Sequence, residues 1–250
     1  MSRERPSSSL LPVPLGHRDR GIALALLLSL FLWQLPYGGL VLYPFKLLAT
    51  WIHEMSHGLV MFASGAGFSS LDIYRDTSGI AHAVTGTSQL GRALIASAGY
   101  MGASIIGALA LVMAQSGRAC RLALALMALA MGASALFWVN NDFGHVVAWT
   151  GAAMFGGAAV LLPEKWAGWA LSFVAAQACV NAVLDIRVLF RSQLVINGEV
   201  VGASDATKMA EASFGTPTFW AATWLVWSFL VFYLALRVAY LRERRSARRS

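Results

Sequence analysis

The chain has 250 residues, of which 58% are hydrophobic and 12% are charged. Soluble globular proteins are about half apolar and about a quarter charged, so this composition excludes an ordinary soluble domain and predicts an all-α polytopic membrane protein. The net charge of +7 does not indicate a nucleic-acid partner, because the arginines gather at the chain ends and in short connections, where anionic lipid headgroups attract them.

The first part of the chain contains two predicted spans and a hairpin. Residues 1–20 read as a disordered basic leader, and residues 21–240 as one membrane domain. A first span is expected from Gly21 to Tyr43, and a second from 45 to 64 after Pro44, which suits a first helical turn. The residues from Phe68 to Val84 alternate around Thr77-Ser78-Gly79, which predicts a short β-hairpin at the membrane edge.

The rest of the chain continues with apolar runs joined by tight connections. They lie at about 92–115, 120–140, 143–162 and 166–190, and a polar segment from 191 to 215 precedes a last run, Thr216–Tyr240. Many Gly, Ala and Ser residues in these runs allow close approach between helices. We therefore predict about six to seven transmembrane helices.

The charge pattern leaves the topology open. Six arginines from Arg237 to Arg249 mark residues 241–250 as a basic cytoplasmic tail, and the leader is basic as well. Seven spans would place the two ends on opposite sides. Either the run 143–162 is re-entrant or split, or one end departs from the charge rule. We expect an integral protein of a bacterial inner (plasma) membrane, with the lipid bilayer as its surroundings and an oligomeric state that the sequence leaves undetermined.

The second span carries the pattern His53-Glu54-Met55-Ser56-His57. Residues four apart share a helical face, so both imidazoles can bind one Zn²⁺ ion, with Glu54 beside them as general base. Each ionisable group inside an apolar span costs about 2.5 to 3.5 kcal/mol to insert, so the three together favour a metal site over a chance match.

A catalytic zinc ion usually has three protein ligands, and the third must come from elsewhere in the chain. We predict Asp185, because an unpaired carboxylate near the end of an apolar run is costly. Asn181, one helical turn earlier, is the predicted substrate-binding residue. An ion pair of Asp185 with an interfacial arginine is the alternative. Asp205 is the competing ligand, although Ser204-Asp205 also reads as a helix N-cap.

These residues resemble the site-2 protease class of intramembrane zinc metalloproteases, in particular its small, uncharacterised bacterial branch. The likeness is carried by Tyr43 to Gly67, Ala98 to Gly102, Asn181 to Phe190 and Ser204 to Ala210. It implies zinc held by His53 and His57, Glu54 as the acid/base, and Asp185 in place of the aspartate of the family's Leu-Asp-Gly motif, with Ile186 where the family has glycine.

The predicted function is a zinc metalloendopeptidase that hydrolyses peptide bonds in or near transmembrane segments with a zinc-activated water molecule. Its partner would be a membrane-protein or peptide substrate. A metal-binding transporter and a catalytically inactive membrane scaffold remain the alternatives.

Overall fold

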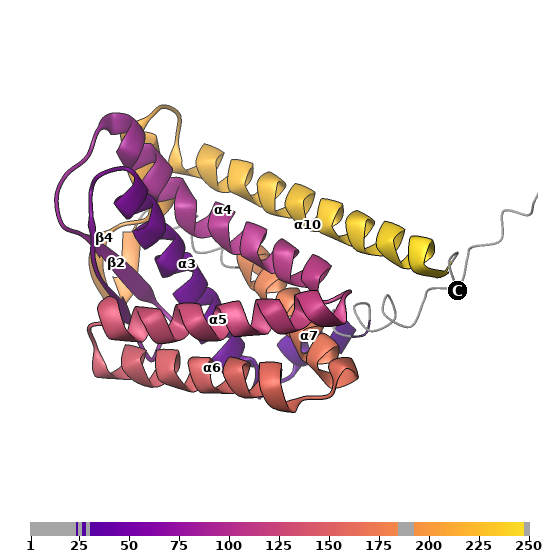
Figure 1. Ribbon diagram of the computed structural model, residues 1–250. Helices are drawn as coiled ribbons and strands as arrows, with labels where there is room; N and C mark the ends of the chain where they lie inside the picture. Colours follow the sequence, from indigo (N-terminus) through magenta and orange to yellow (C-terminus); the bar gives the residue numbers. More distant parts are fainter. Residues whose placement is uncertain (1–23, 25–26, 29–30, 185–192, 248–250) are drawn as a thin grey trace, which may run out of the picture.

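The computed structural model describes residues 24, 27–28, 31–184 and 193–247, which form a helical bundle with two small β-hairpins at one end (Figure 1). The predicted leader and Asp185 lie outside these described residues. The elements are α2 (Gly38–Val41), α3 (Tyr43–Ala63), β1 (Phe68–Ile73), β2 (Gly79–Ala83), α4 (Gln89–Met113), α5 (Gly117–Phe137), α6 (Asp142–Leu161), α7 (Glu164–Leu184), β3 (Gln193–Ile196), β4 (Glu199–Ala203), α9 (Asp205–Ala212) and α10 (Pro217–Ala247).

Helix α4 lies at the centre of the bundle and packs against α3, α7, α9 and α10. Its small residues allow this. A Cβ at Gly107 would lie 3.3 Å from the Cβ of Ala178 on α7, so the two backbones are almost in contact there. Ser104 of α4 also lies 2.6 Å, Oγ to Oγ, from Ser228 of α10. The prediction that small residues permit close helix packing is confirmed.

Helix α3 is fixed by its two ends and by one buried hydrogen bond. Pro44 occupies its first turn, and Gly65, with φ of 78°, follows its C-terminal cap in the left-handed conformation that glycine tolerates best. Trp51 of α3 donates from Nε1 to Oγ of Ser134 on α5 at 2.9 Å. The face of α3 that carries the motif is therefore held in a fixed rotation against the bundle.

Strands β1 and β2 form the predicted antiparallel hairpin, which is thereby confirmed. The outer edge of β1 is covered, because Leu71 N donates to Trp138 O at 2.8 Å and Asn140 N donates to Leu71 O at 3.1 Å. Within the described residues no further strand pairs with the other edge of β2. That edge keeps its backbone hydrogen-bonding groups available.

A second hairpin, β3–β4, lies in the segment that the sequence analysis described only as polar. Its turn meets the turn of the first hairpin, where Asn197 N donates to Oδ2 of Asp76 at 2.6 Å. Partial burial raises the pKa of the Asp76 carboxyl, but hydrogen bonds from Ser78 and Asn197 outweigh this and hold the pKa below its ordinary value. Asp76 is therefore ionised at neutral pH and ties the two turns together.

Four of the described helices are long and apolar enough to cross a membrane: α4, α5, α6 and, within α10, Pro217–Arg242. The predicted count of six to seven spans is not confirmed. The imidazoles and carboxylate of the motif lower the hydropathy of α3, which is not among the four. Residues 142–161 form one continuous helix, so the alternative in which this run is split is wrong.

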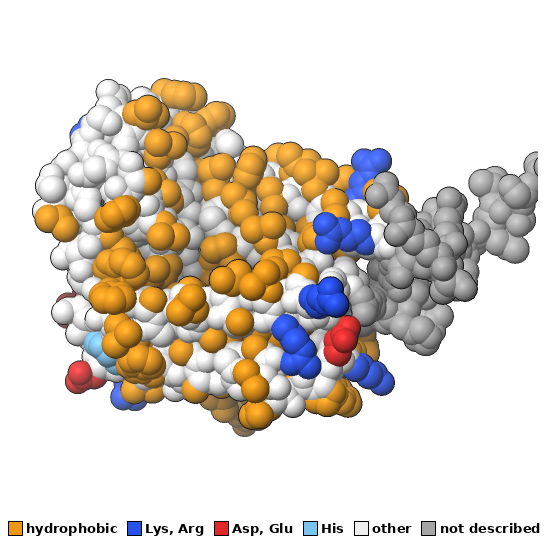
Figure 2. All heavy atoms as spheres, in the orientation of Figure 1, with side chains coloured by type: hydrophobic (Ala, Val, Ile, Leu, Met, Phe, Trp, Pro, Cys, Tyr) orange, Lys and Arg blue, Asp and Glu red, His pale blue; other side chains and the backbone are white. Residues whose placement is uncertain are grey.

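The surface matches a membrane environment. Figure 2 shows hydrophobic side chains spread over α5, α6 and α10, and Lys and Arg gathered at the end of the bundle where α10 finishes. Exposed large apolar residues such as Leu129, Leu161 and Phe229 belong to this apolar surface. Large apolar residues exposed along whole helices are typical of a surface that faces lipid. The protein is an integral membrane protein.

Candidate metal centre

The two histidines and the glutamate of the motif line a cavity on one side of α3. The Nε2 atoms of His53 and His57 are 3.0 Å apart. Both rings are largely buried, with side-chain exposures of 17% and 6%. The spacing of four residues therefore brings the two imidazoles to one point, as the sequence predicted.

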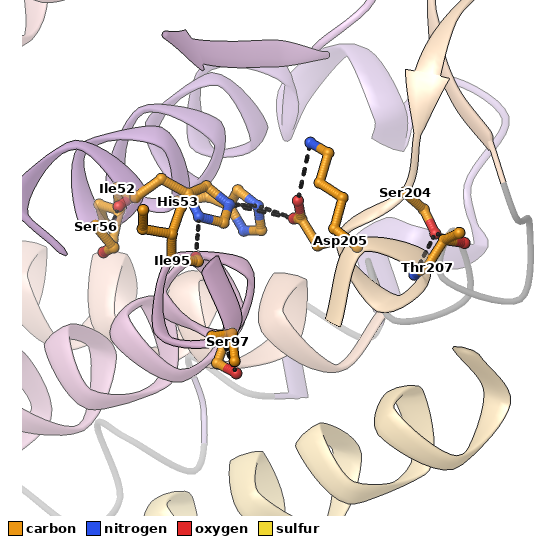
Figure 3. Close-up of polar contacts among 11 residues, drawn as sticks. Ile52, His53, Ser56, Ile95, Ser97, Ser204, Asp205 and Thr207 are labelled. Carbon is orange, nitrogen blue, oxygen red and sulfur yellow. Dashed lines mark hydrogen bonds and ion pairs between the residues drawn. The ribbon is translucent and has the colours of Figure 1, made fainter. Parts of the chain in front are cut away.

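The third group at this point is Asp205, the first residue of α9. Its Oδ2 lies 3.1 Å from His53 Nε2 and 3.2 Å from His57 Nε2 (Figure 3). Ser204 is the N-cap of α9 and accepts from Thr207 N, so the predicted cap is confirmed, with Ser204 in that role. Because Ser204 caps the helix, the Asp205 carboxylate is left to face α3. These three residues form the one His/Cys/Asp/Glu group within the described part of the chain that could hold a metal ion.

Two other predicted site residues are not part of this group in the described part of the chain. Asp185 falls outside the described residues, so its predicted role as a ligand stays a prediction. Asn181 is buried on α7, donates from Nδ2 to Phe45 O at 3.3 Å, and is not among the residues that line the cavity. His82 pairs with Asp72, and His145 Nδ1 donates to the carbonyl of Asn141, so both imidazoles are engaged away from this centre.

The two imidazoles are held by helix α4. His57 donates from Nδ1 to Ile95 O at 2.6 Å, which leaves Nε2 as the nitrogen that can bind a metal. The rings of His53 and Tyr100 meet edge to face at 4.6 Å between centroids. Between these contacts, Gly99 brings the backbone of α4 against both imidazoles, and a Cβ at this position would overlap them.

Gly99→Ala is therefore expected to abolish stable metal binding, because α4 and the imidazoles cannot both keep their positions. Gly157→Ala on α6 is the matched control, since a Cβ there meets nothing within 4 Å. Zinc content per purified protein, measured by atomic emission, is the readout. A Gly99→Ala protein that keeps a full equivalent of zinc would contradict this account of the site.

Glu54 is also positioned by its neighbours. It is 7% exposed, and the backbone of β2 packs on its side chain, since a Cβ at Gly79 would lie 2.8 Å from Glu54 Cγ and 2.7 Å from Thr50 Cγ2. Thr50 in turn donates to Thr77 O at 2.6 Å, which fixes the turn of the hairpin on α3. The hairpin thus forms one wall of the site.

The cavity in front of these residues has a volume of about 900 Å³. It lies between α3, α4, α9, the β1–β2 hairpin and β3, and its lining mixes apolar and charged side chains. Met61, Ile80 and Ile95 belong to the apolar part, and Lys208 and Glu211 of α9 to the charged part. The space is large enough for several residues of an extended peptide.

A comparison with protein families matches residues 22–235 to the Peptidase M50B-like family. The chain belongs to this family. It is the site-2 protease family, so the resemblance stated from the sequence is confirmed. Membership in the M50B-like family implies a metallopeptidase, and the apolar helices make it an intramembrane one. Searches of curated proteins and of solved structures gave no match.

For this M50B-like protein, sequence reasoning ranked Asp205 below Asp185 and missed the supporting roles of Gly99, Ile95 and Gly79. The sequence signal for Asp205 was ambiguous, because either Ser204 or Asp205 could cap α9, and the structure assigns the cap to Ser204. The backbone contacts carry no signal in a single sequence.

Proposed function

We propose that this protein is a zinc endopeptidase that hydrolyses peptide bonds in or near the transmembrane segments of other proteins. The observation that carries the proposal is the Asp205 carboxylate, which lies 3.1 and 3.2 Å from the two imidazole nitrogens, with Glu54 on the same helix. Two histidines and a carboxylate, with a fourth position left open, are a ligand set of catalytic zinc.

The spacing of these atoms suits a tetrahedral ion. Zinc–ligand bonds of about 2.0 to 2.2 Å at tetrahedral angles put neighbouring ligand atoms about 3.3 to 3.6 Å apart. The three separations here are 3.0, 3.1 and 3.2 Å. An ion can therefore be accommodated with shifts of a few tenths of an ångström, and the donor set fits zinc better than magnesium or calcium, which prefer oxygen ligands.

In the proposed hydrolysis the metal and Glu54 have separate roles. A zinc ion held by His53, His57 and Asp205 would supply Lewis-acid chemistry, polarising the scissile carbonyl and acidifying the attacking water. Glu54 accepts a proton as the water oxygen bonds to the carbonyl carbon, and the electron pair of the C=O bond moves to the carbonyl oxygen. Glu54 then gives the proton to the amide nitrogen as the C–N bond breaks.

The cavity suits an unwound substrate. The unpaired edge of β2 contributes Gly79, Ile80 and Ala81 to the lining, and an extended chain added to this edge would bring its carbonyl groups past Glu54. A transmembrane helix satisfies its own backbone hydrogen bonds, so unwinding exposes groups that the strand edge can satisfy instead. The free edge of β2 therefore supports a membrane-protein substrate that is recognised mainly through its backbone.

The proposed function is tested by removing the metal from the purified protein and adding it back. Purified protein in detergent is assayed on fluorescein-labelled casein and on single-span membrane proteins in proteoliposomes, before and after dialysis with 1,10-phenanthroline. We expect one equivalent of zinc, loss of cleavage on chelation, and recovery with added zinc.

Absence of zinc-dependent cleavage from both substrate sets would count against the peptidase. Transfer of zinc into sealed proteoliposomes would favour a transporter instead, in which the metal must leave the site.

A further inference from the structure

The reaction proposed above moves negative charge onto the substrate's carbonyl oxygen, and enzymes stabilise such charge with fixed donors beside it. Glu54 becomes neutral as it takes the proton, so the anionic charge of the site moves from this carboxylate to the substrate. A cation beside both Glu54 and the substrate's carbonyl oxygen would therefore have an anionic group next to it before and after this proton transfer. The candidates for this role are the cations that line the cavity.

Among the described residues, three lysine or arginine residues line the cavity: Lys46, Arg92 and Lys208. Lys46 lies over the ring of Trp33, with Nζ 4.4 Å from the centroid. Arg92 donates to Thr87 O at 3.3 Å. Lys208 differs from these two because it contacts the metal centre itself. Its Nζ lies 3.6 Å from Oδ1 of Asp205.

The contact of Lys208 with Asp205 leaves the ammonium group available. At 3.6 Å it is an ion pair longer than a hydrogen bond, and it uses the Asp205 oxygen that does not face the imidazoles. The side chain is 49% exposed, on the cavity side of α9. An ammonium group has three donors on a flexible stem, so Lys208 can keep this ion pair and donate to a second group.

The position of Lys208 is set by the same helix that sets Asp205. The two residues are three apart on α9, whose cap at Ser204 fixes its first turn. Met209, the next residue, is buried against Ser97 of α4. The Ser204 cap and the packing of Met209 both fix α9. The backbone of Lys208 therefore has a defined position, about one helical turn from the metal ligand Asp205.

We propose that Lys208 is a catalytic residue that donates to the substrate's carbonyl oxygen as the C=O electron pair moves onto it. This inference rests on the proposed peptidase function and adds a residue to it. The role requires a positive charge with an N–H donor at position 208, and it does not require Lys208 for zinc binding.

The test compares Lys208→Met, which keeps the stem and removes the charge, with Lys208→Arg, which keeps the charge. Loss of one such donor lowers kcat by about 100-fold or more, so we expect that loss in Lys208→Met, with KM changed far less and one equivalent of zinc retained. Lys208→Arg is expected to recover a large part of kcat.

A second readout does not depend on turnover. A phosphinic peptide carries an anionic tetrahedral group in place of the scissile amide, and its affinity for the zinc-loaded protein can be measured by calorimetry. We expect about 100-fold weaker binding to Lys208→Met than to the unaltered protein.

Unchanged kcat and unchanged phosphinic-peptide affinity in Lys208→Met would overturn the proposal, while leaving the peptidase function intact if Glu54→Gln is still inactive. Loss of zinc from Lys208→Met would also overturn it, because the lysine would then act by holding Asp205. If the unaltered protein cleaves nothing, the peptidase function fails, and the binding comparison still decides whether Lys208 recognises an anionic tetrahedral group.

Discussion

Replacing Glu54 with Gln is expected to lower peptide hydrolysis by about 10²- to 10⁴-fold and to leave zinc content unchanged. The amide has nearly the shape of the carboxylate, so the packing of Glu54 against the backbone at Gly79 is retained. It cannot accept a proton from the attacking water, so the general base is lost. Because Glu54 is not among the three residues that meet at the metal centre, the ligand atoms are unaffected.

The measurement is kcat on casein together with zinc content for each variant. Glu164→Gln, the same chemical change at the start of α7, serves as control and should behave like the unaltered protein. Full activity in Glu54→Gln would end the peptidase proposal, whereas loss of zinc along with activity would show that Glu54 belongs to the ligand set.

Asp205→Ala is expected to weaken zinc binding strongly and to abolish activity. Loss of a residue that only orients a metal ligand costs about 10- to 100-fold in metal affinity, and loss of a ligand itself should cost more. The substitution removes the oxygen that lies within 3.2 Å of both imidazoles. Ala is compatible with the first turn of α9, and Ser204 still caps the helix, so the fold is expected to persist.

Asp185→Ala is the informative comparison, because the sequence pattern and the family resemblance both point to that residue. Zinc affinity measured against a competing chelator should fall in Asp205→Ala and hold in Asp185→Ala. The reverse result would identify Asp185 as the third ligand and would contradict the metal centre formed with Asp205, on which the proposed function depends.

The sequence was sufficient for the parts of the protein that follow from local pattern. Apolar run length predicted the membrane helices, a change of periodicity predicted the β1–β2 hairpin, and the spacing of His53 and His57 placed both rings on one face. The span count was less secure, because the same polar groups that make α3 a candidate site lower its hydropathy.

The second hairpin was not predicted because its strands are short and partly exposed. Strands of four and five residues with mixed side chains give little alternation, and the signal that remains is the turn at Asn197-Gly198. The hydrogen bond from Asn197 in this turn to Asp76 joins residues 121 positions apart, and no local sequence pattern can predict such a contact.

The sequence by itself determined that this is a membrane protein and that one helix presents two imidazoles and a carboxylate to a common point. Only the tertiary structure shows that Asp205 meets them, since it lies 152 residues from His53 along the chain. Both Asp185 and Asp205 had an adequate local explanation, as an ion-pair partner and as a helix cap. The choice depends on how α9 packs on α4 beside α3, and such packing is set by many weak contacts at once, none of which is visible in the spacing of a few residues.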